Sequence, residues 1–284
     1  MSAPPLSRPA GWRRVSLVSD VAAVTRVMAE DPVGACMVAA RVADHGVDPR
    51  AIGGELWARG RAEQALCYAG ANLIPLRGAA ADLRAFADRA LSVGRRCSSV
   101  VGPAELVMPM WERLRLGWGP ARDVRERQPL LALRSRPECA ADPAVRRVSV
   151  NELDAYLVAA IDMFIGEVGV DPRAGDGGRG YRRRVAGLIA AGRAFARFES
   201  GQVVFKAEVG SQSPAVGQIQ GVWVHPDWRG RGLGTAGTAA VADAVLNSGR
   251  IASLYVNSFN TVARAAYARV GFRQVGTFAT VLLD

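Results

Sequence analysis

A glycine-rich run after an apolar stretch carries the clearest chemistry in this sequence. Residues 222–235 read VWVHPDWRGRGLGT, so apolar residues lead through Pro226 into three alternating glycines. Because glycine has no Cβ, such a loop bends tightly and lets a ligand approach its backbone. A helix beginning after the loop would add unpaired N–H groups and the positive end of its dipole. The run therefore predicts a cradle for a pyrophosphate, with Arg229 and Arg231 at its rim.

Three classes of phosphate ligand could use this loop. A P-loop for nucleoside triphosphates needs Lys after its glycines, and residues 232–235 (GLGT) have none. Residues 232–237 (GLGTAG) match the dinucleotide fingerprint G-x-G-x-x-G, but seven residues (225–231) separate them from the preceding strand. The carboxylate that this fingerprint needs after the next strand is also missing at residues 255–257 (YVN). Both departures favour the third class, the pyrophosphate of coenzyme A.

A second motif follows near the end of the chain, where residues 260–272 read NTVARAAYARVGF. Together with residues 229–234 (RGRGLG), it resembles the GNAT superfamily of acyl-CoA-dependent N-acyltransferases. The family's phosphate loop has Q or R, any two residues, G, any residue, and G or A. Its helix motif reads N-x-x-A-R-x-x-Y-x-x-x-G-F. The resemblance covers roughly residues 145–284 and includes the typical Val224-x-Pro226 before the loop.

The resemblance implies that acetyl-CoA is the cofactor and that its pantetheine arm lies between two parallel strands, 216–224 and 251–256. Asn260, Ala263 and Tyr267 share one helix face by their spacing, and Asn260 is expected on the arm. The Tyr267 hydroxyl is expected near the sulfur as general acid, a role typically worth ~10²–10⁴ in rate. The cofactor-binding residues implied in this way are Val222, Trp223, Val224, Arg229, Gly230, Arg231, Gly232, Leu233, Gly234, Thr235, Asn260, Ala263, Arg264 and Tyr267.

The general base is harder to identify. Many family members carry Glu on the strand before the loop, but the corresponding residue here is Gln218, and Gln220 is also an amide. Glu208 on the preceding strand and Glu167 near the acceptor-side loop are alternative bases, while Asp171 could bind an amine. Water could also carry the proton, or the amine could enter neutral. The catalytic residues expected are Tyr267, Glu208 and Glu167.

Alternating strands and helices are expected to position these residues. Asn151 is a candidate helix N-cap, and Ser200-Gly201 is a hairpin turn. Gly249 and Gly271 are expected to end helices. The elements predicted from residue 145 onward are strands 145–150, 194–199, 202–209, 216–224 and 251–256, helices 152–166, 181–191, 233–246 and 261–270, a glycine-rich loop 169–180, and final strands within 272–283.

The first half repeats this order of elements. Strands are predicted within 65–76 and at 97–101, and helices at 80–91 and 104–116, with Gly117-Trp118 in the place of Gly271-Phe272. In this alignment Arg113 replaces Tyr267 and Leu106 replaces Asn260, and residues 77–82 (RGAAAD) replace the glycine loop. We interpret the first half as an eroded internal copy, with chance similarity of two α/β halves as the alternative.

The predicted organisation is an α/β (α+β) chain of two GNAT-like domains, each a mixed, largely antiparallel sheet flanked by helices. Residues 134–143 contain two prolines and no hydrophobic period, which is typical of a linker. The predicted boundaries are a degenerate GNAT-like domain at 1–136, a linker at 137–143 and a catalytic domain at 144–284.

Composition excludes several other classes. The net charge of +10 over 284 residues is spread over both halves, and every basic residue except Lys206 is arginine, so we do not favour nucleic acid as a partner. No apolar run approaches the ~20 residues of a membrane span, and no signal-peptide pattern is present, which favours the cytoplasm. Four scattered cysteines and two histidines predict no metal site. We interpret His225, in the turn before the loop, as structural.

These observations predict an N-acetyltransferase that moves an acetyl group from acetyl-CoA to a primary amine. The acceptor, a small molecule or a protein, is expected to attack directly in a ternary complex. The alternative is a CoA-binding regulatory or scaffold protein with little catalysis, which Gln218 and Gln220 favour and Tyr267 opposes.

Overall fold

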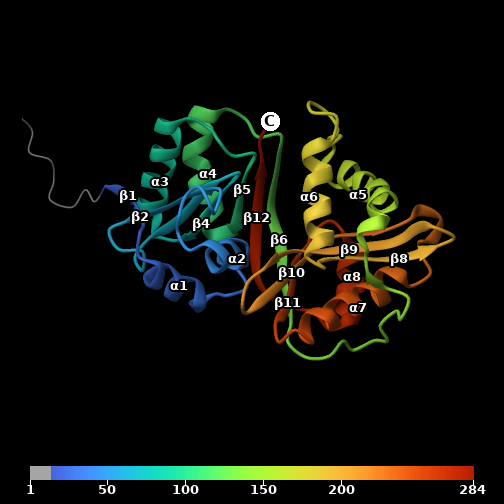
Figure 1. Cartoon of the computed structure of the whole chain (residues 1–284). Coiled ribbons are helices and arrows are strands. Elements are labelled where there is room, and N and C mark those ends of the chain that lie inside the picture. The colour runs from blue at the N-terminus through green and yellow to red at the C-terminus, as the bar shows by residue number, and fades with distance from the viewer. Residues whose placement is uncertain (1–13) are drawn as a thin grey trace, which may run out of the picture. The chain divides into compact units, whose positions relative to one another are not determined.

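The computed structural model describes residues 14–284, which form two compact units (Figure 1). Unit 1 comprises the chain up to Asp31, Asp44–Glu126 and Ala279–Asp284. Unit 2 comprises Pro32–Ala43 and Arg127–Phe278. The units cross the predicted boundaries at 136 and 144, because residues 32–43 and 127–136 belong to unit 2 and residues 279–284 to unit 1. Each unit therefore joins segments that are distant in the sequence.

Hydrogen bonds explain why residues 32–43 belong to unit 2. Helix α2 (Cys36–His45) begins with a buried thiol, and the Cys36 Sγ lies 3.8 Å from the Ser211 carbonyl oxygen and 3.6 Å from that of Val216. The carbonyl oxygens belong to the sheet of unit 2, so the first turn of α2 is fixed to that sheet. Burial raises the pKa of the Cys36 thiol to about 11, which keeps it protonated.

Unit 1 has a mixed sheet in the strand order β1–β2–β3–β4–β5–β12. The strands β1 to β4 pair in antiparallel fashion and β4 pairs with β5 in parallel. Apolar side chains from α3, α4 and the end of β12, including Phe86, Trp111 and Val281, form its core. The elements are β1 (Val15–Leu17), α1 (Val21–Glu30), β2 (Gly54–Arg59), β3 (Leu66–Gly70), β4 (Asn72–Arg77), α3 (Ala80–Val93), β5 (Ser99–Pro103) and α4 (Ala104–Trp118).

Unit 2 has a mixed sheet in the order β6–β11–β10–β9–β8–β7, with the first residues of β12 beside β6. Only the β10–β11 pair is parallel among the registered pairs of this unit, so the sheet is largely antiparallel, as predicted. The strands are β6 (Asp123–Leu133), β7 (Arg146–Arg147), β8 (Ala194–Glu199), β9 (Gln202–Gln212), β10 (Val216–Val224), β11 (Ile251–Tyr255) and β12 (Arg273–Leu282).

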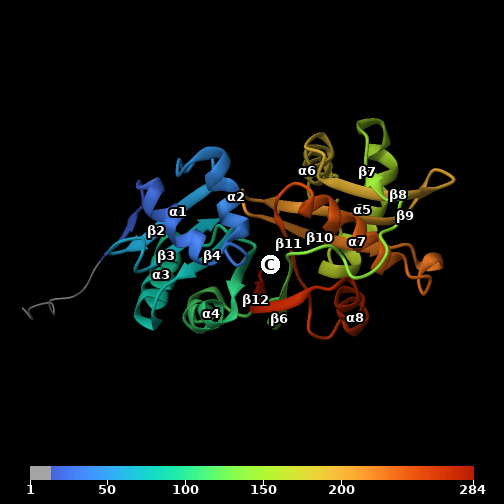
Figure 2. The same ribbon diagram turned by 90° about the horizontal axis from the view of Figure 1, so that it is seen from below.

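Two pairs of helices cover opposite faces of this sheet (Figures 1 and 2). Helices α5 (Leu153–Val168) and α6 (Arg179–Ala190) pack with β8 and β9 around Tyr156 and Leu188. Helices α7 (Leu233–Leu246) and α8 (Thr261–Val270) pack on the other face around Phe205 and Leu254. The predicted bounds of α7 and α8 are confirmed. Within residues 14–284, no helix combines the length and the apolar character needed to cross a bilayer.

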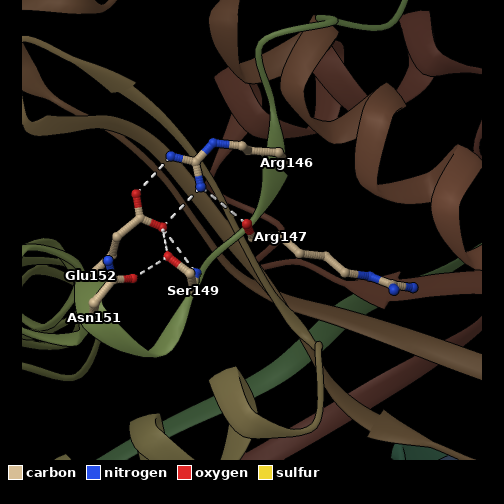
Figure 3. A network of polar contacts seen from close by, with 5 residues as sticks. All are labelled: Arg146, Arg147, Ser149, Asn151 and Glu152. Carbon is tan, nitrogen blue, oxygen red and sulfur yellow. Dashed lines mark hydrogen bonds and ion pairs between the residues drawn. The ribbon is translucent and has the colours of Figure 1, made fainter.

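The start of α5 differs from the prediction that Asn151 is the N-cap. Ser149 caps a short 3-10 turn (Val150–Glu152) that precedes the helix, and the Ser149 N–H donates to Glu152 Oε2 at 2.9 Å (Figure 3). Arg146 holds the same carboxylate with two hydrogen bonds, of 2.6 and 2.8 Å. The Arg146 guanidinium, more than any other group, lowers the pKa of Glu152 to about 2. The assignment to Asn151 was wrong because a capping box two residues earlier competes for this turn.

The third glycine of the GLGTAG segment has a packing explanation. A Cβ at Gly237, in α7, would lie 2.6 Å from two ring atoms of Phe205, which is fully buried in β9. The helix can approach the strand this closely only because Gly237 has no side chain.

We therefore expect Gly237→Ala to lower the free energy of unfolding by about 1–3 kcal/mol, because the buried Phe205 ring cannot move aside. Gly187→Ala is the matched control, since a Cβ at this exposed position in α6 meets no atom within 4 Å. This substitution should raise stability by about 0.5–1 kcal/mol. Urea denaturation checks both, and equal effects at the two positions would contradict the packing argument.

Candidate active site

The two parallel strands of unit 2 separate early. The register between β10 and β11 covers only Val216–Gln218 and Ile251–Ser253, although β10 continues to Val224. Beyond this point β10 is registered with β9 alone, with a register shift between Gln220 and Trp223. Backbone groups on the β11 side of β10 are therefore available to an extended ligand, since buried N–H and C=O groups need partners. These are the two strands, predicted at 216–224 and 251–256, between which the resemblance places the cofactor arm.

The glycine loop leads into a helix whose N-terminus carries no side-chain cap. Gly230 and Gly232 have φ values of +74° and +79°, a region that favours glycine, and Gly232 is the N-cap residue of α7. No atom lies within 4 Å of a Cβ placed at either glycine. Open space therefore borders both glycines, and the positive end of the α7 dipole follows directly after them, which suits an anion.

The two arginines at the rim of this loop are oriented by backbone contacts. Arg229 Nε donates to the Val224 carbonyl oxygen at 3.2 Å, and Arg231 Nη2 donates to that of Asp227 at 3.0 Å. The Arg231 guanidinium also lies 4.9 Å from the ring centroid of Trp228. His225 is held between Gln202 and the Asp227 N–H, which agrees with its interpretation as structural.

Tyr267 lies on α8 with its ring buried in the core, 6.2 Å from the ring centroid of Phe272. Burial raises the pKa of the Tyr267 phenol, and the negative charge of Glu167 acts in the same direction. The hydroxyl is therefore protonated at neutral pH, the form that a general acid requires. Glu167, exposed in the last turn of α5, is near enough to influence it.

The start of α8 supplies further polar groups. Asn260 Oδ1 accepts a hydrogen bond from the Ala263 N–H at 3.1 Å and caps the helix, so only its amide nitrogen remains to donate to a ligand. Arg264 Nη1 donates to the Ser258 carbonyl oxygen at 3.0 Å. Arg264 also lines a surface pocket of about 360 Å³ together with Arg127, Pro129, Ser258, Gln274 and Thr277.

Glu208 is buried, and its two carboxylate oxygens contact other side chains. Its Oε1 accepts from Arg184 Nη2 and from Gln220 Nε2, both at 2.8 Å, and its Oε2 lies 3.7 Å from Lys206 Nζ. Desolvation alone would raise the pKa of Glu208, but the charges of Lys206 and Arg184 outweigh it and lower the pKa. An ionised carboxylate with a low pKa is a weak base, so these contacts favour a structural role for Glu208.

The remaining acidic and amide candidates differ in their surroundings. Asp171 forms an ion pair with Arg173 at 2.7 Å and so is already neutralised. Gln218, at the family's base position, is buried, and neither of its amide atoms has a hydrogen-bond partner within residues 14–284. Its register partner Ser253 is buried with an equally unpaired hydroxyl. Glu167 is exposed in the last turn of α5, and its charge adds to the effect of burial in raising the pKa of both Tyr181 and Tyr267.

The cluster around Lys206, Arg184 and Tyr156 was not predicted from the sequence. The available signal was the one lysine of an arginine-rich chain, placed inside the apolar strand 202–209 (QVVFKAEV). A charged residue in such a strand is rare unless it is paired in the interior. Lys206 pairs with Glu208 two residues later, and Glu208 in turn pairs with Arg184 of a helix earlier in the chain, a contact that no sequence pattern indicates.

Unit 1 lacks the corresponding groups. The helix after its β4 strand begins at Ala80, and the Asp82 carboxylate accepts from the Ala79 N–H at 2.9 Å, so an acidic side chain occupies this helix N-terminus. Arg113, which replaces Tyr267, forms an exposed ion pair with Asp88 at 2.6 Å. The Asp82 carboxylate also forms an ion pair with Arg59 at 2.7 Å, so this helix N-terminus is already occupied by side chains of the protein.

Family comparisons match the two parts of the chain separately. Residues 206–281 match the family described as FR47-like protein, and residues 54–156 match a domain of unknown function, DUF4081. A comparison with curated proteins finds no match. Within residues 14–284, no group of three or more His, Cys, Asp or Glu side chains could hold a metal ion.

Solved structures share the fold over most of the chain. A Drosophila protein superposes with a TM-score of 0.64 at 10% identity, covering 95% of this chain and 98% of that chain. An acetyltransferase of the GNAT family from Colwellia psychrerythraea gives 0.57 at 10% identity, covering 95% and 100%. A GCN5-related N-acetyltransferase from Kribbella flavida gives 0.54 at 16% identity, covering 87% and 96%. The chain therefore has the fold of the GNAT acetyltransferases, as its two motifs predicted, with an FR47-like segment at residues 206–281.

Proposed function

We propose that this chain is an N-acetyltransferase that transfers an acetyl group from acetyl-CoA to a primary amine. The observation that carries the proposal is the separation of β10 from β11 after Gln218, directly before the uncapped, glycine-rich start of α7. A gap between strands suits an extended amide-containing arm, and the helix N-terminus suits the pyrophosphate attached to it.

The residues present fit this cofactor. The open space around Gly230 and Gly232 admits a phosphate group, and Arg229 and Arg231 neutralise its charge. The backbone of β10 from Val222 to Val224 would bind the arm. Trp223, Leu233, Gly234, Thr235, Ala263 and Arg264 complete the proposed cofactor contacts, with the Asn260 amide nitrogen as a donor. Bound acetyl-CoA would supply the activated acetyl thioester.

Two side chains are proposed to move protons. Tyr267 holds its phenol proton because its ring is buried, and it would donate that proton to the departing thiolate. Glu167 is the favoured acceptor of the amine proton, directly or through water, because it is exposed and its charge reaches Tyr267. Glu208 remains a weaker alternative, since Arg184 and Gln220 already use one of its oxygens.

Unit 1 is proposed to be a degenerate, non-catalytic copy. The acceptor, a small molecule or a protein amine, would therefore be acetylated at unit 2 alone.

A second function, a CoA-binding regulator with little catalysis, is favoured by one observation. Gln218 occupies the family's base position as an amide without hydrogen-bond partners in the described chain.

Release of free thiol from acetyl-CoA over a panel of amines distinguishes the two functions. We expect amine-dependent thiol release by the intact chain, because the site offers both a protonated acid and a carboxylate. Tight acetyl-CoA binding without release over small amines and amine-bearing peptides would support the regulator instead. Absence of acetyl-CoA binding would contradict both.

The phosphate cradle is tested by Gly234→Glu. An added carboxylate at the start of α7 favours the helix dipole but repels a pyrophosphate, so folding stability should be kept while CoA affinity falls. A Cβ at Gly234 has room, since its nearest neighbour is a Val224 methyl at 3.6 Å. We expect at least about a tenfold rise in the CoA dissociation constant by calorimetry, equivalent to ~1.4 kcal/mol. Gly187→Glu is the control, and equal affinities for the two variants would refute the cradle.

The acid is tested by Tyr267→Phe. Removing one hydroxyl should lower kcat by ~10²–10⁴ with the acetyl-CoA dissociation constant unchanged. Tyr68→Phe is the matched control, because the Tyr68 hydroxyl donates to the Ile52 carbonyl oxygen in unit 1 and its loss should affect stability alone. Unchanged turnover in Tyr267→Phe would rule out the acid role.

A further inference from the structure

The one lysine of the chain is fully buried in β9, and its ammonium group lacks hydrogen bonds to the described residues. Lys206 has no exposed surface, and its Nζ has no hydrogen-bond partner within residues 14–284. Its nearest charge is Glu208 Oε2 at 3.7 Å, and the Tyr156 ring centroid lies 5.3 Å away. Burying an ammonium costs several kcal/mol, and a hydrophobic side chain of similar volume often packs at least as well. A structural role alone therefore gives a weak account of this residue.

The ammonium lies directly behind an irregularity in β10. Gly221 has a φ of +60° and lies within the register shift between Gln220 and Trp223, which we call the β10 bulge (Gln220–Trp223). A Cβ at Gly221 would lie 3.0 Å from Lys206 Nζ and 3.0 Å from Met163 Cε. Glycine is therefore required there both by its backbone angle and by the ammonium behind it.

Hydrogen bonds fix Glu208, the counter-ion of Lys206, relative to this bulge. Gln220, the first residue of the bulge, donates to Glu208, and Arg184 donates to the same oxygen. Lys206 Nζ is the charged atom nearest to the Gly221 Cβ position, at 3.0 Å, whereas Glu208 Cδ lies 3.7 Å from it, so the ammonium contributes most to the field at the bulge. Burial lowers the pKa of Lys206, while the charge of Glu208 favours its protonated form. Of the three charged side chains, that of Arg184 is 45% exposed, whereas Lys206 and Glu208 are almost wholly enclosed.

We propose that Lys206 is a positioning residue for acyl transfer, whose buried ammonium polarises the β10 bulge against which the thioester carbonyl lies. This inference rests on the proposed function, in which the backbone of β10 beyond Gln218 binds the cofactor arm. When an amine attacks a thioester, its carbonyl oxygen gains negative charge. A fixed cation in the weakly screening interior stabilises that charge without touching it. Lys206 acts through the Gly221 backbone, which separates it from the strand gap.

The test compares the wild type with Lys206→Met/Glu208→Gln, which removes both charges and leaves no lone buried ion. We expect kcat to fall by about tenfold, less than on loss of a hydrogen-bond donor that touches the oxyanion, because Lys206 acts through the Gly221 backbone. The acetyl-CoA dissociation constant should stay unchanged. The infrared C=O band of bound carbonyl-¹³C acetyl-CoA should move to higher wavenumber, because the carbonyl is less polarised. A merely structural pair would leave this band in place.

The control removes a surface ion pair between α6 and α5, the helices that carry Arg184 and Tyr156. Arg182→Met/Asp154→Asn neutralises the exposed ion pair between α6 and α5, and neither kcat nor the carbonyl band should change. Amine-dependent turnover by the wild type would support the proposed function. If the band and kcat were then unchanged in Lys206→Met/Glu208→Gln, the role of Lys206 would be overturned. If the wild type bound acetyl-CoA without turnover, the function would fail and the band would still decide the role of Lys206. Failure of the wild type to bind acetyl-CoA would overturn both.

Should the double variant not fold, Glu208→Gln alone replaces it. This substitution keeps the ammonium and removes its nearest counter-charge, so the carbonyl band should move to lower wavenumber, opposite to the double variant. A band at the wild-type position in a folded Glu208→Gln protein would overturn the inference.

Discussion

The early separation of β10 from β11 is the constraint on which the rest of unit 2 depends. Parallel strands normally satisfy each other's backbone groups, but this pair stops after Gln218 and Ser253. The groups beyond that point need another partner, and a ligand with its own amides can provide one. The bulge, the glycine loop and the start of α8 follow the separated strand ends in the chain, so each can contribute to one extended site.

The two faces of the sheet serve different purposes. Along β9, Phe205 and Ala207 point into the apolar core beneath α7 and α8, while Lys206 and Glu208 form the charged cluster beside Tyr156 of α5. Because side chains alternate along a strand, one short segment carries both environments. The apolar face fixes α7 against the sheet through Phe205 and Gly237. On the charged face, Lys206 and Glu208 lie beside the bulge in β10.

Helix α3 of unit 1 begins differently from helix α7 of unit 2. Asp82 occupies the N-terminus of its helix α3, where unit 2 has the uncapped glycines of α7. Its sheet is completed by Ala279–Asp284 from the end of the chain, and the Leu283 N–H donates to the Ser98 carbonyl oxygen at 2.9 Å. The division into units thus depends on pairing between distant segments, which a linker-like composition at 137–143 does not reveal.

The sequence by itself determined the features that depend on neighbouring residues. The left-handed glycines of the loop, the bounds of α7 and α8 and the strand before the loop follow from local conformational preference and hydrophobic period. The tertiary structure alone decided the partners of Glu208, the burial of Lys206, the place of α2 against Val216 and the contribution of β12 to both units. These are contacts between residues far apart in the chain, and their energies depend on packing and burial that no short window of sequence contains.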